Sequence, residues 1–402
     1  MKIAIVAPSH KSFIAELLPN YSFDILPNGY AGATFVGTII KELLERGHEV
    51  IAVTTSVCVG DNYEVKVFKH NNFSWYVVPE RPYSIKFNGK KPGRIIDLFA
   101  FEIRLMSEIL INLKPDFIHS FWSYEFTAAA KNSNLPFLAT IEDNAFVILK
   151  YLKNPYRFGR LIMSERILKD IRFLSTVSPY MVEYCKRKGA IVKVIPNPTP
   201  IVNDIAAIQL FIQNRINIFP KFKIVMINNG WELRKNGKCG LLAFQQLLIK
   251  YPDATLHLFG SGSEEGGAAA ADANSIHLKN VYFHGMVPKD VIFSHLKEAH
   301  LFLHPALEES FGVVLIEAMA LGVPAIGGEK SGGVPWVIDD QDLLVDVFDH
   351  KKISEKLINI LSDKKLYHQK SVSAFTKAES KYSGKIIVDS FTNYYNEILQ
   401  QW

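Results

Sequence analysis

One stretch in the second half of the chain decides the fold, Glu309-Ser310-Phe311-Gly312-Val313-Val314-Leu315-Ile316-Glu317-Ala318-Met319-Ala320-Leu321-Gly322-Val323-Pro324. Residues 313–321 are apolar apart from Glu317, which is typical of a buried helix. Gly322 stands where a helix C-terminal cap is expected, and Pro324 prevents the helix from continuing. The stretch therefore predicts a short buried helix between two strands, which is the repeating step of an α/β fold.

Two carboxylates and a helix N-terminus make this stretch a candidate binding site. The first N–H groups of a helix lack backbone partners, so those of Gly312, Val313 and Val314 are placed to receive a phosphate. Glu309 precedes that end, and Glu317 shares a helical face with Val313 and Val314, where its carboxylate can accept two hydrogen bonds from a ribose diol. From the spacing alone, the alternative is that both acids are solvated side chains.

Four motifs surround these acids: His304-Pro305, Glu309-Ser310-Phe311-Gly312, Glu317-Ala318-Met319-Ala320 and Gly332-Gly333-Val334-Pro335. Together they resemble the donor-site segment of the retaining GT-B glycosyltransferases of family 4. The resemblance implies transfer of a sugar from a nucleotide diphosphate sugar, UDP- or GDP-linked, to a hydroxyl of a glycan, a lipid-linked sugar or a small molecule. It implies retention of configuration and no cofactor, because the nucleotide sugar is a substrate.

The resemblance also implies roles for individual residues. Glu309 would hold hydroxyls of the donor sugar, Glu317 would hold the ribose, and backbone near Gly285 would read the nucleobase. The implied donor-binding residues are Gly230, Arg234, Lys235, Gly285, Met286, Val287, Glu309, Ser310, Phe311, Gly312, Val313, Val314 and Glu317.

A basic loop, Asn228–Asn236, follows the first strand expected in the second half, and resembles the family's diphosphate-binding segment. Lys235 is the first choice for neutralising charge on the leaving phosphate, and is assigned with Glu309 to the catalytic set. Arg234 adds a planar donor fork, and Lys238 is the reserve. The chain departs from the family at Trp231, where an arginine commonly follows the glycine. A solvated Lys/Arg pair is the alternative interpretation.

Two loops of the first half are expected on the acceptor side. The family usually carries a Gly-Gly pair where this chain has Gly29-Tyr30-Ala31-Gly32, which indicates either a reshaped pocket or an ordinary turn. Glu142-Asp143 follows a strand at the position where the family often places His-Asp. We assign Gly32, Glu142 and Asp143 to this side and Glu142 also to the catalytic set, without naming it a general base.

Strand-like and helical runs alternate along the chain and predict parallel sheets covered on both faces. The expected fold is α/β, GT-B, with two Rossmann-like doubly wound domains facing across a cleft. Residues 1–198 would form the acceptor-side domain and residues 199–384 the donor-binding domain, and the resemblance implies that helix 385–402 packs back on the first. Other expected features are a linker at Pro196–Pro200, helices at Arg94–Leu113 and Pro179–Lys188, and a loosely packed insertion at Ala268–Ala271.

Composition narrows the remaining function classes. With 402 residues, 48% of them hydrophobic, the chain fits two globular domains. Cys58, Cys185 and Cys239 lack metal-ligand spacing, no aspartate pair is placed for a divalent ion, and we expect no metal site. The first strand-like run is too short for a signal peptide, so we expect a cytoplasmic protein. A dehydrogenase would need Gly-x-Gly-x-x-Gly after that strand, where Pro8-Ser9-His10 stands.

Basic residues gather in Lys150–Arg172, interleaved with apolar ones. This amphipathic segment predicts either peripheral contact with anionic lipid on the cytoplasmic face of a membrane, or a solvated charged helix. The expected partners are the nucleotide sugar and a sugar or lipid-linked acceptor, with no nucleic acid, and the oligomeric state is left open. The departures at Trp231, Tyr30-Ala31 and Glu142 leave a non-catalytic nucleotide-sugar-binding protein as the alternative.

Overall fold

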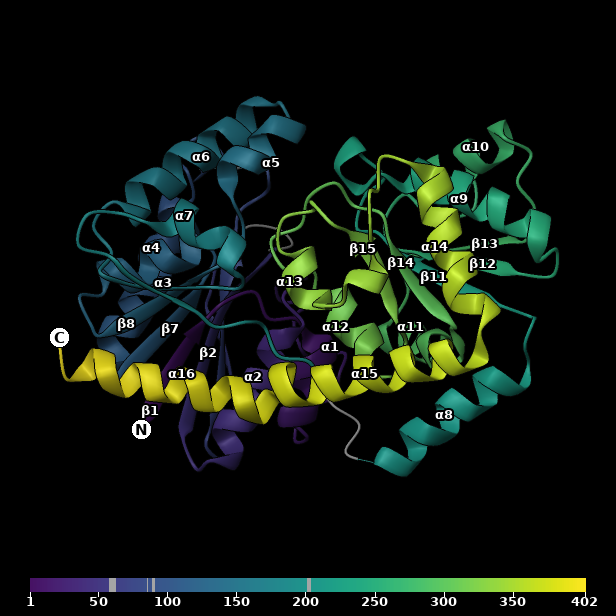
Figure 1. Cartoon of the computed structure of the whole chain (residues 1–402). Helices are drawn as coiled ribbons and strands as arrows, with labels where there is room; N and C mark the ends of the chain where they lie inside the picture. Colours follow the sequence, from purple (N-terminus) through teal and green to yellow (C-terminus); the bar gives the residue numbers. More distant parts are fainter. Residues whose placement is uncertain (58–62, 85, 89–90, 201–203) are drawn as a thin grey trace. The chain divides into compact units, whose positions relative to one another are not determined.

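The computed structural model describes residues 1–57, 63–84, 86–88, 91–200 and 204–402, and the chain divides into two α/β units (Figure 1). Unit 1 comprises Met1–Pro198 and Gly384–Trp402, and unit 2 comprises Thr199–Ser383. Cys58 lies outside the described residues, while Cys185 and Cys239 are buried and free.

Unit 1 is built on an eight-stranded sheet in the order β10-β9-β8-β7-β1-β2-β4-β3. Every pairing in this sheet is parallel except that of the edge strand β3 with β4. The central strands are buried along almost their whole length, as expected of a parallel sheet with both faces covered. The strands are β1 Lys2–Val6, β2 Glu49–Val57, β3 Lys66–His70, β4 Phe73–Glu80, β7 Phe117–Phe121, β8 Phe137–Ile141, β9 Phe173–Thr176 and β10 Ile191–Val194; β5 Phe87–Asn88 and β6 Lys91–Pro92 form a separate hairpin.

Helices of unit 1 connect these strands. They are α1 Lys11–Ile14, α2 Phe35–Glu45, α3 Ala100–Leu113, α4 Glu125–Asn132, α5 Ala145–Tyr151, α6 Pro155–Leu168, α7 Val182–Cys185 and α16 Gly384–Leu399. The C-terminal α16 lies against α2 and closes the core of unit 1. Its Tyr395 hydroxyl lies 2.6 Å from Nδ1 of the buried His119 on β7, and its ring stacks on Phe117.

Two helix predictions for unit 1 were wrong in extent. The helix expected from Arg94 begins only at Ala100, because Leu98 and Phe99 have φ of 50° and 68°, which an α-helix cannot contain. The helix expected over Pro179–Lys188 is a 3₁₀ turn at Pro179–Met181 followed by the single turn of α7. A local backbone conformation that the apolar pattern does not encode delays the start of the first helix and interrupts the second.

Unit 2 is built on a six-stranded parallel sheet in the order β13-β12-β11-β14-β15-β16. Chain order reverses between β11 and β14, so their carboxyl ends form the switch point at which α/β sheets bind ligands. The strands are β11 Lys223–Ile227, β12 Thr255–Phe259, β13 Val281–Gly285, β14 Leu301–His304, β15 Ala325–Gly328 and β16 Leu344–Val345.

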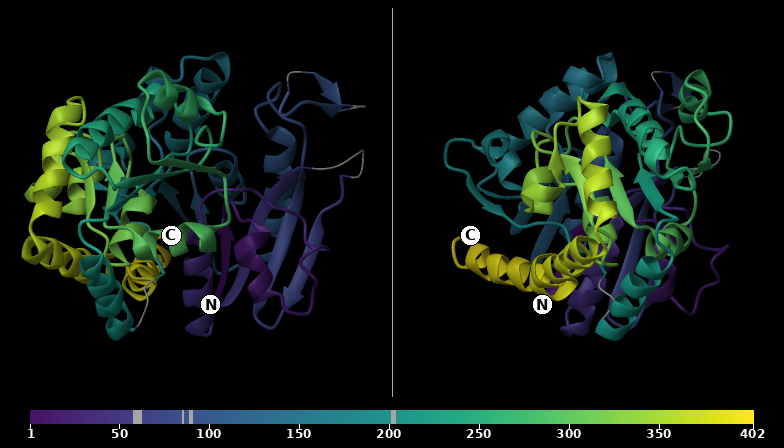
Figure 2. Two further views of the ribbon diagram at one scale, coloured as in Figure 1. Left: turned by 90° about the vertical axis from the view of Figure 1, so that its right-hand side faces the viewer. Right: turned by 45° about the vertical axis from the view of Figure 1, so that its right-hand side comes forward.

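Helices cover both faces of this sheet, and α14 lies beside α9 (Figure 1 and Figure 2). They are α8 Ile205–Asn217, α9 Gly237–Lys250, α10 Ala268–Ser275, α11 Lys289–Glu298, α12 Val313–Met319, α13 Val334–Ile338, α14 His350–Ser362 and α15 Lys364–Tyr382. The alanine run expected as a loose insertion is α10 instead. Ala269, Ala270 and Ala273 are buried there, because small side chains let this helix pack closely.

The decisive helix α12 forms as predicted. Gly312 precedes it with φ of 89°, a conformation that favours glycine, and the helix begins at Val313. Gly322 follows it with φ of 64°, and its N–H donates to the Met319 carbonyl at 2.9 Å, which ends the helix. This local geometry fixes where the Glu309 loop enters the helix and where Glu317 projects.

Candidate active site

The loops after β11 and β14 meet at the carboxyl edge of the unit 2 sheet. The N–H of Leu307 donates to the Arg234 carbonyl at 2.8 Å, and Asn236 Nδ2 donates to the Pro305 carbonyl at 3.0 Å. A 3₁₀ turn at Leu233–Lys235 then directs the two basic side chains of the first loop toward the second. Residues far apart in sequence are thereby held next to each other by one backbone hydrogen bond and one from the Asn236 side chain.

Lys235 and Glu309 form the centre of this arrangement. Lys235 Nζ donates to Glu309 Oε2 at 2.7 Å, and both side chains are largely buried. Nε2 of the buried His304, at the end of β14, lies 3.7 Å from the same carboxylate oxygen, and Arg234 Nη1 lies 3.8 Å from it. One carboxylate therefore faces three nitrogen groups, those of a lysine, an arginine and a histidine.

The charge of Glu309 follows from these neighbours. Burial alone would raise its pKa, but Lys235, His304 and Arg234 together hold the pKa of this carboxyl well below its usual range. Burial lowers the pKa of His304 in spite of the nearby carboxylate. Glu309 is therefore an anion at neutral pH and can accept hydrogen bonds from hydroxyls. It lies beside the neutral imidazole of His304.

Arg234 is held by two further acids. Its Nη1 lies 3.6 Å from Glu308 Oε2 and donates to the Glu308 carbonyl at 3.3 Å, while Nη2 donates to Glu232 at 3.5 Å. Its side chain is 16% exposed, so its guanidinium stays within reach of a ligand at the strand ends. Arg234 is thus neither the freely solvated side chain of the alternative interpretation nor fully enclosed.

Glu317 is also not a solvated side chain. Its carboxylate on α12 is buried and accepts from Lys289 Nζ at 2.7 Å, across from the start of α11. This ion pair offsets the cost of burying the Glu317 carboxylate. The predicted contact with a ribose would have to form beside this ion pair or in exchange for it.

The remaining donor residues are placed in different ways. Gly230 has φ of 106° and donates to the Ser261 carbonyl at 3.1 Å, and Gly285 has φ of 62°. Met286 is strongly exposed, whereas Phe311 is buried against the rings of Trp336 and Tyr382. Only the backbone of Phe311 is therefore available to a ligand. Val287, Ser310, Val313 and Val314 are half-buried, and the predicted roles of this set stay predictions.

Trp231 fills space that two glycines leave open. Its ring lies against Gly237 and its Cβ lies close to Gly262, and Nε1 donates to Asp272 on α10 at 2.9 Å. Lys238, the reserve for phosphate binding, is half-exposed and lies 3.3 Å from the same Asp272. The departure from the family at Trp231 is thus a packed and hydrogen-bonded feature that leaves Arg234 and Lys235 together at the strand ends.

In unit 1, Glu142 follows β8 and has a different environment. Asn197 Nδ2 donates to its Oε2 at 2.7 Å, and its Oε1 is buried without a hydrogen-bond partner among the described residues. Burial, with a smaller effect of Asp143, raises the pKa of Glu142 to about 8 although Asn197 opposes the shift. The carboxyl is therefore protonated at neutral pH, which suits a hydrogen-bond donor rather than a base.

The glycine-flanked loop of unit 1 has one packed and one open part. The Tyr30 ring makes edge contacts with Trp122 and Phe126, and burial raises the pKa of its hydroxyl to about 12. Gly32 is exposed with φ of 116°, and a Cβ there would meet no atom within 4 Å. The tyrosine thus belongs to the packing of unit 1, while the position of Gly32 requires glycine for its backbone conformation.

The basic segment 150–172 is not one helix. It spans the end of α5, a break at Leu152–Asn154 and all of α6, which Asn154 caps. Arg160, counted in the basic face, is buried, pairs with Glu125 and lies over the Tyr124 ring at 3.6 Å. It is therefore not available to lipid, and membrane contact stays a prediction for the other residues. Among the described residues, no helix has the length and apolar content needed to cross a membrane.

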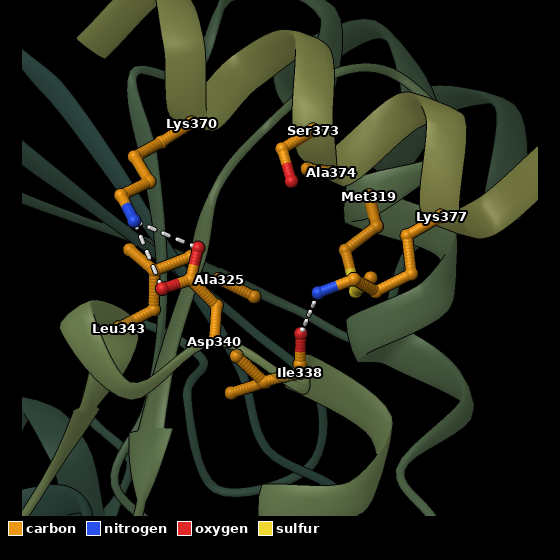
Figure 3. A pocket seen from close by; sticks show the side chains of 9 residues that line it. All are labelled: Met319, Ala325, Ile338, Asp340, Leu343, Lys370, Ser373, Ala374 and Lys377. Atoms are coloured by element: carbon orange, nitrogen blue, oxygen red, sulfur yellow. Dashed lines mark hydrogen bonds and ion pairs between the residues drawn. The ribbon is translucent and has the colours of Figure 1, made fainter. Parts of the chain in front are cut away.

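A small pocket in unit 2 lies among α13, α15 and β15 (Figure 3). Lys370 Nζ contacts both oxygens of Asp340 at 2.9 Å, and Lys377 donates to the Ile338 carbonyl at 2.6 Å. Its volume of about 10 Å³ corresponds to one water molecule. Because its charged groups already satisfy one another, we assign it no ligand.

Sequence reasoning missed three residues of the site. His304 stands inside a quoted motif at a strand end but received no role, although strand ends are where such sheets bind ligands. Glu308 directly precedes Glu309, but only Glu309 was predicted to belong to the site. Lys289 had no signal in the sequence, because its contact with Glu317 depends on the packing of α11 against the α12 region.

Comparisons with known proteins agree with this geometry. Residues 209–375 match the family described as "Glycosyl transferases group 1", and residues 32–201 match "Glycosyltransferase Family 4". The chain is 24% identical over 390 residues to N-acetyl-alpha-D-glucosaminyl L-malate synthase of Bacillus anthracis, covering 92% of this chain and 94% of that protein. It is 32% identical over 137 residues to phosphatidyl-myo-inositol mannosyltransferase of Mycolicibacterium smegmatis, covering 34% and 35%.

Solved structures show the same fold. Sucrose-phosphate synthase from Thermosynechococcus elongatus superposes with a TM-score of 0.75 at 17% identity, over 100% of both chains. With its two α/β units and a basic, carboxylate-bearing site at a strand switch point, the protein has a GT-B fold. The chain belongs to the group 1 glycosyltransferases and is a glycosyltransferase enzyme.

Proposed function

We propose that this enzyme transfers a sugar from a nucleoside diphosphate sugar to an acceptor hydroxyl with retention of configuration. The observation that carries the proposal is Glu309, a buried carboxylate held anionic by Lys235, Arg234 and His304 at the strand ends of unit 2. An anion beside fixed cations suits a ligand that presents both hydroxyls and phosphates. The cations lower the energy of the negative charge that develops on a leaving diphosphate.

Each residue has one part in this scheme. Lys235 and Arg234 bind the diphosphate, Glu309 accepts hydrogen bonds from sugar hydroxyls, and Glu317 accepts from the ribose. The bond between the anomeric carbon and the phosphate oxygen breaks, and a bond to the acceptor oxygen forms. The acceptor's proton passes to the departing phosphate.

Similar proteins support a nucleotide-sugar donor without selecting one base. A relative from Corynebacterium glutamicum, 29% identical over 179 residues, is named GDP-mannose-dependent. An Escherichia coli structure with a TM-score of 0.68 is titled as bound with UDP-2-fluoro glucose. Their names also differ in acceptor, so we propose an acceptor hydroxyl on a sugar, a lipid-linked sugar or a small molecule.

Calorimetric titration with UDP, GDP and ADP tests the donor site. We expect one of them to bind, and Lys235→Ala to weaken it by about 1–3 kcal/mol, since a charged hydrogen bond to phosphate is lost. Lys238→Ala is the matched control, because its ammonium is half-exposed and pairs with Asp272, and we expect its dissociation constant to match the unmodified chain. An unchanged constant in Lys235→Ala overturns the assignment, and a larger loss in Lys238→Ala would transfer it to that residue.

A further inference from the structure

Three histidines of unit 2 converge away from the Lys235–Glu309 site. His257 lies on β12, His284 on β13 and His295 on α11, and one ring nitrogen of each lies within 4.8 Å of the other two. Nδ1 of His257 and Nε2 of His284 are 3.0 Å apart, and Nδ1 of His295 is buried without a hydrogen-bond partner among the described residues. We propose that these three imidazoles form a binding site for a transition-metal dication, with Zn²⁺ as the expected ion.

The spacing fits such an ion. Zn²⁺ binds imidazole nitrogen at about 2.0–2.1 Å in tetrahedral geometry, which places neighbouring ligand nitrogens about 3.3 Å apart. The His257–His284 pair is close to that separation already. His295 lies on α11, whereas the other two histidines lie on the sheet. An adjustment of the His295 side chain alone would therefore complete three ligands. A water molecule would then supply the fourth ligand.

The rings are held in orientation by aromatic neighbours. His284 stacks on Phe259 with ring centroids 4.4 Å apart and planes 6° apart, and His257 stacks on Tyr282 at 4.7 Å and 12°. The register of β12 with β13 places His257 opposite Tyr282 and shifts between Leu258 and Phe259, and the His284 ring stacks on both His257 and Phe259. Rings locked in this way lose little freedom when they coordinate an ion.

Two nearby charges act in opposite directions. Lys223 on β11 acts against added positive charge at all three histidines, and its Nζ contacts Glu298 Oε2 at 2.7 Å, which partly offsets that effect. A bound ion would replace the hydrogen bond between His257 Nδ1 and His284 Nε2. The alternative is a stack of neutral imidazoles that serves packing alone, and the sequence had predicted no metal site.

The site would act on one connection of unit 2. His284 precedes the segment 285–288, and His295 follows it in the second turn of α11. A bound ion would tie both ends of this segment together and to β12. The inference concerns stability and metal binding, and does not depend on the donor site proposed above.

Titration of the metal-free full chain with Zn²⁺, in competition with a chromophoric chelator, tests the proposal. We expect one equivalent to bind, with at least tenfold weaker binding in both His284→Gln and His295→Gln. His368→Gln is the matched control, because His368 is exposed on α15 and should leave the affinity unchanged. Absence of zinc binding, or binding that both substitutions leave unchanged, overturns the site.

A second measurement uses the unmodified chain, so it stands even where a variant fails to fold. Co²⁺ substitution should give the intense visible bands of a four-coordinate nitrogen site, and Zn²⁺ should raise the melting temperature. Weak six-coordinate bands, or thiolate charge-transfer bands that indicate cysteine ligands, overturn the proposal.

Discussion

Glu142 of unit 1 and Glu309 of unit 2 are both buried carboxyls in loops that follow parallel strands, yet they differ in charge. Glu142 faces the amide of Asn197 and has Asp143 beside it, and its pKa is raised to about 8. Glu309 faces Lys235, Arg234 and His304, and its pKa is held far below the usual range. Burial pushes both toward the neutral acid, so the partners decide which one becomes an anion.

The largest expected effect comes from neutralising Glu309. Glu309→Gln keeps the shape of the side chain but removes the anion that pairs with Lys235 and that we propose accepts hydrogen bonds from the donor sugar. We expect glycosyl transfer to fall at least 100-fold, about 2.7 kcal/mol in the barrier. Product formation is measured with the donor that the nucleotide titrations identify.

Glu329→Gln is the control for this substitution, because Glu329 is exposed and pairs only loosely with Lys330 at 3.9 Å. It should retain full activity. A loss of less than threefold in Glu309→Gln would remove the distinction between the two buried glutamates.

The second effect concerns the stability of the folded protein. Folding favours the neutral acid of Glu142, whereas it favours the anion of Glu309. The pKa of Glu142 is raised in the folded state above its unfolded value of about 4.3, so its stabilising contribution is complete below about pH 4.3. It is lost as the pH rises through about 8. Glu142→Gln imitates the protonated acid, and should be more stable than the unmodified chain at pH 8.5 by on the order of 2 kcal/mol.

Urea unfolding at pH 5 and pH 8.5 measures this difference, which should nearly vanish at pH 5. Glu183→Gln is the control, since the Glu183 side chain is 81% exposed and should give no pH-dependent gain. An equal effect of Glu142→Gln at both pH values would show that Glu142 is not protonated in the folded state.

The smallest expected effect is on nucleotide affinity, and it distinguishes the proposed role of Glu317 from that of Lys235. If Glu317 accepts from the ribose, Glu317→Gln should weaken a nucleoside diphosphate by about 1 kcal/mol, the size of one hydrogen bond. Inorganic pyrophosphate lacks the ribose, so its binding should not change. Lys235→Ala should weaken both ligands in the same calorimetric experiment. A loss of pyrophosphate binding in Glu317→Gln would mean that this residue acts only through Lys289 and the packing of α11.

The predictions confirmed by the structure rest on signals carried by neighbouring residues. Gly312 precedes α12 and Gly322 follows it. Both have a positive φ, a left-handed conformation that glycine adopts readily and that marks the two ends of the helix. The GT-B fold followed from such punctuated alternation and from motifs around Glu309. The Lys235–Glu309 contact joins two loops that the fold brings to one sheet edge, so knowing the strand order was enough to expect them near each other.

What could not be predicted depends on contacts between distant segments. The alanines of α10 show no amphipathic period, so the sequence pattern does not predict this helix. In the structure the helix packs through its alanines, and Asp272 accepts a hydrogen bond from Trp231. The three histidines have no ligand spacing in sequence, since they meet only through the β12–β13 register and the placement of α11. Likewise, the raised pKa of Glu142 comes from burial in the folded chain, which Asn197, 55 residues later, only partly opposes.

Helix α16 has a consequence for the order in which the protein is made. Its residues complete the core of unit 1 around His119, yet they are synthesised after all of unit 2. Domains generally fold as units while the chain emerges from the ribosome, N-terminal segments first. Here unit 2 can finish before unit 1, and a nascent chain stopped before Gly384 would hold a complete unit 2 together with a unit 1 sheet whose His119 still lacks its tyrosine partner.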